Sequence, residues 1–248
     1  MAAEDSAKKV QQLREERMGQ KERAPLEHYL AEFAAASPEE MAARSGIAYD
    51  TDAKCFSLRI LGRPTMVSWP DLEVRDVATG GQAPTHVRIL LACLLLRGKL
   101  VPAAGKYLAY PEVPWGSHYF RAFEARCIKR LARTYEEDID GFAARCRKLG
   151  ATEREGADAC FDVELVDGVF LRLSLWEGDE EFPANAQITF SDNAPLAFSA
   201  EELAYAGDVV IAAIDAQGLG DVDAVSSASV KAAEHIDAVS SASVKASE

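Results

Sequence analysis

The chain has 248 residues, of which 48% are hydrophobic and 27% are charged. This is the composition of an ordinary globular protein, and it excludes a wholly disordered chain. The 27 basic and 40 acidic residues give a net charge of −13 at pH 7, which disfavours binding to nucleic acid or to anionic lipid. There is no run of about 18 apolar residues and no apolar signal segment, so we expect a cytoplasmic protein without direct membrane insertion.

The N-terminal quarter of the chain has helical periodicity. Residues 6–36 repeat their apolar positions at intervals of three to four, with a break at Pro25. A short helix is then expected, with Ser37 as its N-cap and Pro38 at its first position. Gly46 follows this helix and predicts its end.

The next region has strand-like periodicity and then a strongly apolar segment. Two or three antiparallel strands are expected between residues 55 and 69, with a break at residues 62–64. Residues 85–97 are apolar nearly all round. A helix with no polar face is expected to lie in the centre of a fold.

A strongly amphipathic helix is predicted over residues 117–135, and a further helix over residues 139–149. Basic side chains line one face of the first of these helices; they are Arg121, Arg126, Lys129, Arg130 and Arg133. This basic face is either solvated or a docking patch for an acidic partner or a flavin phosphate.

The C-terminal half of the globular region returns to strand-like patterns. Strands are expected over residues 161–165, 170–176 and 186–190, with a two-residue turn at Asp167-Gly168 between the first two. A last helix is expected to begin at Ser199. Strands and helices thus come in blocks rather than in βαβ units, which favours an α+β fold.

The predicted fold is therefore an antiparallel β-sheet packed with helices, with an N-terminal helical extension and a flexible C-terminal tail. We expect a charged extension over residues 1–24, a globular α+β domain over residues 25–217 and the tail over residues 218–248. The five scattered cysteines form no Cys-x-x-Cys pair, so we expect reduced thiols that serve as small core side chains.

One acidic loop is a weak candidate for a metal site. The segment 176–183 reads Trp-Glu-Gly-Asp-Glu-Glu-Phe-Pro, and Glu177, Asp179 and Glu181 offer carboxylate oxygens of the kind that bind divalent cations. The other interpretation is a solvated hairpin tip held by packing of Trp176 and Phe182. We favour the tip, because ligands for such cations usually come from several segments.

The globular region resembles a known family. The segment around Val67-Ser68-Trp69-Pro70, the Leu-rich residues 89–96 and the acidic segment 176–183 are similar to the domain-of-unknown-function family 3786, over about residues 26–214. That family occurs in anaerobic bacteria and archaea, and some members are joined to iron–sulfur segments. The resemblance implies no activity and no catalytic residues, and this chain lacks an iron–sulfur cysteine motif.

The tail contains a perfect ten-residue repeat. Residues 223–232 read Asp-Ala-Val-Ser-Ser-Ala-Ser-Val-Lys-Ala, and residues 237–246 read the same. Such exact repetition in a short tail is a strong non-random signal. The alternative origins are slippage in a Ser/Ala-rich linker and an appended tag.

Each repeat resembles the acceptor motif for covalent flavinylation, Asp-x-x-(Ser/Thr)-(Gly/Ser)-Ala-(Thr/Ser). The resemblance implies that an FMN transferase links FMN by a phosphoester to the last hydroxyl. The implied acceptors are Ser229 and Ser243. The other implied motif positions are Asp223, Ala228, Asp237 and Ala242.

These patterns lead to a functional hypothesis with one main alternative, and a third hypothesis is a metal-dependent hydrolase that uses Glu177, Asp179 and Glu181. The hypothesis is an electron-transfer flavoprotein that carries two covalent FMN groups on a mobile tail and shuttles electrons between redox partner proteins, more an electron carrier than a stand-alone enzyme. The alternative is a non-enzymatic accessory or assembly subunit of a redox metalloenzyme complex, which would agree with the acidic composition and the lack of catalytic motifs in the globular region.

Overall fold

The structure, a computed structural model, describes residues 26–216 of the chain. Its strands are β1 (Ala48–Asp50), β2 (Cys55–Ile60), β3 (Arg63–Ser68), β4 (Val74–Asp76), β5 (Tyr107–Ala109), β6 (Thr152–Glu153), β7 (Ala159–Val166), β8 (Val169–Trp176) and β9 (Asn185–Ser191). Its helices are residues 26–35, α2 (Pro38–Ser45), α3 (Thr85–Arg97), α4 (Gly116–Phe123), α5 (Lys129–Tyr135), α6 (Ile139–Leu149), α7 (Ala194–Ala197) and α8 (Ala200–Ala216), with a 3₁₀ turn η1 (Tyr110–Glu112) and a π turn η2 (Glu124–Ile128). The α+β prediction with an antiparallel sheet is confirmed.

All nine strands belong to one sheet in the order β4-β3-β2-β7-β8-β9-β5, with β1 paired to β2 and β6 paired to β7. Each pairing is antiparallel, as expected when consecutive strands are joined by short turns. Strand β2 pairs with β7 at one position, Ile60 opposite Val166. A hydrogen bond from the Leu61 amide to the Leu165 carbonyl, 2.9 Å long, extends this contact.

The β2–β3 hairpin corrects one prediction. Residues 62–64 were expected to interrupt the strands, but Arg63 and Pro64 are the first two residues of β3. The turn consists of Leu61 and Gly62 alone, both with positive φ (48° and 72°), which is the geometry of a tight hairpin. Pro64 is tolerated because it lies at the start of the strand, where its missing N–H is not needed.

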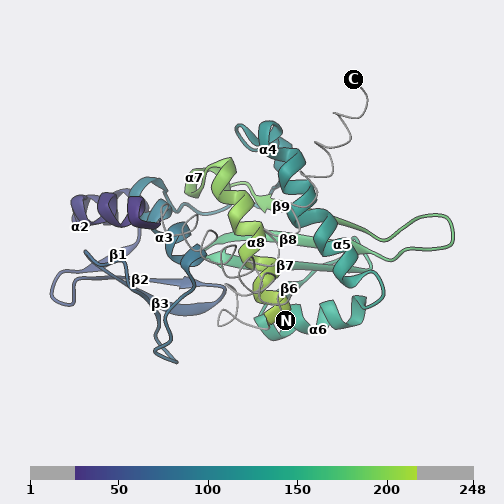
Figure 1. Ribbon diagram of the computed structural model, residues 1–248, viewed down its shortest axis with the longest axis horizontal. Coiled ribbons are helices and arrows are strands. Elements are labelled where there is room, and N and C mark those ends of the chain that lie inside the picture. Colours follow the sequence, from purple (N-terminus) through teal and green to yellow (C-terminus); the bar gives the residue numbers. More distant parts are fainter. Residues whose placement is uncertain (1–25, 217–248) are drawn as a thin grey trace, which may run out of the picture.

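Two apolar helices fill the space against the sheet. Helix α3 is buried along nearly its whole length, which confirms the central helix predicted from its composition. Helix α8 contacts α3, α4, α6 and strand β7. Figure 1 shows α8 crossing the strands β7, β8 and β9, with α3 on one side of it and the α4–α5 helix on the other.

The smaller helices follow their predicted ends. Helix α2 begins at the Ser37 N-cap, whose Oγ accepts a hydrogen bond from the Glu40 amide, and it ends at Gly46 in the left-handed conformation. Helix α6 likewise ends at a left-handed Gly150. These caps satisfy backbone groups that helix ends otherwise leave unpaired.

The helix predicted over residues 117–135 differs from the structure in one respect. It begins at Gly116 and is interrupted by the π turn η2, which widens it between α4 and α5. The widened turn faces Gly207 of α8, where an added Cβ would lie 3.0 Å from both Cys127 Sγ and a Phe123 ring atom. The two helices therefore approach as closely as the absent side chain at residue 207 allows.

The start of α4 is also tightly packed, and this generates a stability prediction. A Cβ added at Gly116 would lie 1.8 Å from the Tyr110 carbonyl oxygen, so Gly116→Ala must displace backbone. We expect the substitution to lower the free energy of unfolding by about 2–3 kcal/mol in urea titrations. Gly81→Ala is the control, because its Cβ meets only the Thr79 hydroxyl at 3.2 Å; we expect a change within about 0.5 kcal/mol. Equal effects of the two substitutions would contradict this account.

Candidate functional site

The predicted flavin acceptors lie outside the described residues. Ser229, Ser243 and the other motif positions in the tail all follow Ala216, the last residue of α8. The structure therefore gives two facts that concern the tail. It gives the position of the C-terminal end of α8, which the tail follows in sequence, and it gives the surfaces of the globular domain that the tail could contact.

The acidic loop connects β8 to β9 and is therefore the tip of a hairpin, which is the interpretation favoured from the sequence. Asp179 closes it: Asp179 Oδ1 accepts hydrogen bonds from the amides of Glu181 and Phe182, and these bonds lower the pKa of its carboxyl. Within residues 26–216 no three His, Cys, Asp or Glu side chains gather as a metal site would require. The expected packing of Phe182 is wrong, since this side chain is 67% exposed.

Two arginines of the basic helix face are engaged inside the protein. Arg126 Nη2 donates a hydrogen bond to Asp208 Oδ2, and Arg130 Nη2 donates one of 2.8 Å to Asp215 Oδ2. Arg130 Nη1 also lies 3.8 Å from Asp208 Oδ1. Asp208 is 3% exposed, so its charge is stabilised by these cations rather than by water.

The five residues of the basic face therefore divide into two groups, which the sequence alone does not distinguish. Arg126 and Arg130 bind the acidic side chains of α8 and hold the two helices together. Arg121, Lys129 and Arg133 are exposed. A solvated face or a docking patch thus remains available only at these three positions.

The five cysteines are free and buried, as predicted. Burial raises the pKa of Cys127 well above its usual value, and the neighbouring Asp208 carboxylate raises it further. Burial also raises the pKa of Cys55, of Cys146 and, to about 12, of Cys93. A protonated, buried thiol is a poor nucleophile and a poor metal ligand, so these side chains serve packing.

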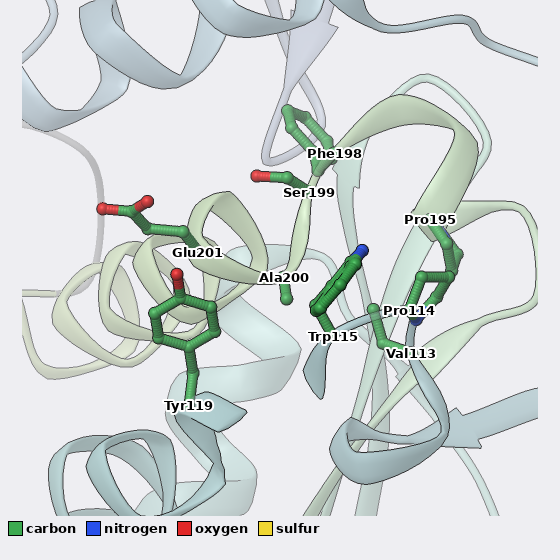
Figure 2. Close-up of a pocket in the computed structure, with 9 residues that line it drawn as sticks. All are labelled: Val113, Pro114, Trp115, Tyr119, Pro195, Phe198, Ser199, Ala200 and Glu201. Carbon is green, nitrogen blue, oxygen red and sulfur yellow. The ribbon is translucent and has the colours of Figure 1, made fainter. Parts of the chain in front are cut away.

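A groove at the start of α4 carries two exposed aromatic side chains, Trp115 and Tyr119. It has a volume of about 230 Å³ and is lined by Val113, Pro114, Trp115, Tyr119, Pro195, Phe198, Ser199, Ala200 and Glu201. Trp115 is 75% exposed and Tyr119 is 45% exposed. Figure 2 shows Trp115 between Tyr119 on one side and Pro114 and Pro195 on the other.

The backbone of Trp115 is unusual for so large a residue. Its φ of 67° and ψ of 0° place it in the left-handed region, which for a bulky side chain is uncommon and costs on the order of 1–3 kcal/mol. The turn is fixed on both sides: the Gly116 amide donates to the Val113 carbonyl (2.8 Å), and the His118 amide donates to the Trp115 carbonyl (3.1 Å). This turn holds the indole at the surface.

Buried contacts join the two sides of the groove. Tyr110 is buried, its ring stacks on Phe123 at a centroid distance of 4.1 Å, and its hydroxyl donates a 2.7 Å hydrogen bond to the Ala200 carbonyl. Ser199 and Glu202 cap α8 reciprocally: the Ser199 amide donates to Glu202 Oε2 and the Glu202 amide to Ser199 Oγ. The lining residues Ser199 and Ala200 are therefore held by hydrogen bonds to their neighbours.

Sequence reasoning missed this groove. Its two sides come from residues 113–119 and 195–201, which are far apart in the chain. The usable signals were Trp115 beside Pro114 and Gly116, and Tyr119 on the polar side of an amphipathic helix.

A family model described as Domain of unknown function (DUF3786) matches residues 37–213, which is most of the chain. The protein is therefore a member of that family of α+β domains. No curated protein and no solved structure matches the chain. Among the residues that the structure describes, no helix is long and apolar enough to cross a membrane.

The buried ion pair between the helices generates a second stability prediction. Asp208→Asn removes the carboxylate that pairs with Arg126, and it leaves that guanidinium largely buried without a carboxylate partner, while Arg130 keeps its pair with Asp215. We expect a loss of about 3–5 kcal/mol in the free energy of unfolding at pH 7, measured by urea titration. The control is Glu124→Gln, which breaks an exposed pair with Lys129 and is expected to cost about 0–1 kcal/mol.

A double variant separates lost packing from unpaired charge. Arg126→Met with Asp208→Leu removes both charges and keeps apolar volume. It is expected to be more stable than Asp208→Asn alone. If Asp208→Asn has the same stability as the unaltered protein, the ion pair does not hold α8 in place.

The raised thiol pKa values predict slow reaction with thiol reagents. At pH 8 the native protein is expected to release almost no thionitrobenzoate from Ellman's reagent, because all five thiols are buried and the pKa values of Cys55, Cys93, Cys127 and Cys146 are raised. After denaturation in guanidinium, all five cysteines are expected to react. A rapidly reacting thiol in the native protein would show that one of them is accessible as a thiolate.

Proposed function

We propose that this protein is an electron carrier with two covalent FMN groups on its C-terminal tail, one at Ser229 and one at Ser243. The single observation that carries the proposal is the exact duplication of the acceptor pattern at residues 223–229 and 237–243. A Ser/Ala-rich linker that repeats by slippage would have no reason to match this pattern.

The residue types suit the modification chemistry. In each repeat the serine Oγ would attack the FMN-side phosphorus of FAD, forming a phosphoester while the pyrophosphate bond breaks and AMP leaves. A transferase would supply the active site for this step. The neighbours of the acceptor, Ala228 and Ala242, are small enough for a tail segment to enter a transferase pocket.

Two features of the globular domain support this proposal: its thiols are buried, and its last helix is anchored in the core. Its buried thiols and buried ion pairs are used for packing, and the redox chemistry would belong to the flavin, which takes up two electrons and two protons when fully reduced. Helix α8 is anchored in the core and would tether the tail to a folded body. Such a tether replaces bulk diffusion by a high effective concentration of flavin near docked redox partners.

Co-expression with an FMN transferase tests the proposal directly. Intact-mass spectrometry is expected to show two FMN phosphoester additions, and the yellow colour is expected to remain with the denatured, precipitated protein. Ser229→Ala and Ser243→Ala are each expected to lose one addition, and the double variant both.

The matched control is Ser227→Gly, which removes a neighbouring hydroxyl and restores the glycine that is commoner in the motif. It is expected to keep both additions. Unmodified mass and colourless protein, both after co-expression and from the native host, would refute the proposal.

A further inference from the structure

We infer that the groove lined by Trp115 and Tyr119 is a docking site for an isoalloxazine ring carried on the C-terminal tail, at Ser229 or Ser243. This inference rests on the proposed flavinylation of the tail and adds to it a place where the flavin is held. The occupant is thus the segment of this same chain that follows α8, with its attached ring.

The groove has the chemistry of a flavin platform. Trp115 and Tyr119 present large aromatic surfaces to solvent, and Pro114 and Pro195 complete an apolar rim. Flat aromatic rings stack on such side chains in offset or edge-to-face contacts. The volume of about 230 Å³ is below the range of about 300–1,000 Å³ that encloses a whole drug-sized ligand, so the groove fits part of a planar ring and leaves the rest in solvent.

The length of chain outside the structure matches the required distance. Ala200 lines the groove at the start of α8, and Ala216 ends the helix 16 residues later, which at 1.5 Å per residue is about 24 Å away. Thirteen residues, 217–229, lead from there to Ser229. A chain of that length has a root-mean-square span of about 18–22 Å and a maximum reach of about 43–47 Å.

Both acceptors can reach the groove. The tether to Ser243 has 27 residues, so its root-mean-square span is about 26–31 Å. The required distance of about 24 Å lies between this span and the shorter span to Ser229, so tether length gives both flavins a similar effective concentration at the groove. One flavin occupies the groove at a time, and the other stays available to partners.

Charge favours docking of the tail. Glu201 is exposed at the rim of the groove, and each acceptor is followed two residues later by a lysine, Lys231 after Ser229 and Lys245 after Ser243. With the ring on Trp115, this lysine can approach the Glu201 carboxylate. Such an exposed pair adds little affinity but orients the segment.

The backbone conformation of Trp115 is consistent with a role in ligand binding. A left-handed backbone at a tryptophan is retained at a cost, and such outliers gather at ligand-binding positions. Here the turn serves to direct an indole outwards, where stability alone would bury it.

Flavin fluorescence of the modified protein tests the inference. A ring stacked on tryptophan is quenched, so Trp115→Ala is expected to raise the emission per flavin about two- to tenfold. Phe182→Ala is the matched control, because it removes another exposed aromatic side chain, in the β8–β9 loop, and is expected to leave emission unchanged. Intact mass and circular dichroism confirm equal flavin content and folding.

Single-acceptor variants test whether each flavin can reach the groove. Ser243→Ala and Ser229→Ala each keep one flavin, and in each variant we expect that flavin to be quenched and Trp115→Ala to restore its emission. If mass spectrometry finds no FMN, the proposed function itself fails. If FMN is attached but Trp115→Ala and Phe182→Ala give the same emission as the parent, docking is refuted while flavinylation stands.

Size-exclusion chromatography with light scattering examines the rival occupant, a second copy of this chain. The monomer mass is expected for both the parent and Trp115→Ala. A dimer that dissociates on Trp115→Ala would assign the groove to self-association and overturn the inference.

Discussion

The contact between α8 and the α4–α5 helix organises the C-terminal half of this protein. The Arg126–Asp208 pair lies at its centre, and Gly207 permits the close approach that brings the two charges together. Coulomb attraction in a desolvated place is strong, but so is the penalty of removing one partner. The result is a helix pair whose relative position is specified by charge as well as by apolar packing.

The position of the groove follows from that contact. Helix α4 supplies Tyr119, α8 supplies Ala200 and Glu201, and Trp115 sits at the turn that leads into α4. The hydrogen bond between Tyr110 and Ala200 joins the two sides beneath the surface. The geometry of this groove, made from two helix starts, thus depends on the buried pair about two helical turns away.

Sequence patterns predicted most of the architecture and little of the surface. Helix α3 was evident because no polar face interrupts residues 85–97, and α2 because Ser37 and Gly46 mark its ends. The π turn was not evident, since inserting one residue into a helical turn leaves the apolar face nearly unchanged. The pairing of Arg126 with Asp208 was hidden for a different reason: it joins residues that are 82 positions apart, and spacing alone carries no information on such contacts.

The sheet is held together by very few backbone hydrogen bonds at one place, between β2 and β7. Strands β1–β4 form one meander, and their backbone ladder to the remaining strands is the single position Ile60–Val166 with the adjacent backbone bond. Arg59 of β2 adds side-chain bonds to Glu164 and Asp167 across the same boundary. Helices, not ladder bonds, must then carry the cohesion between the two halves of the sheet. Proteins open in cooperative units along boundaries of this kind, so the meander is a natural subunit of partial unfolding, and the half that bears the tail can stay folded while it opens.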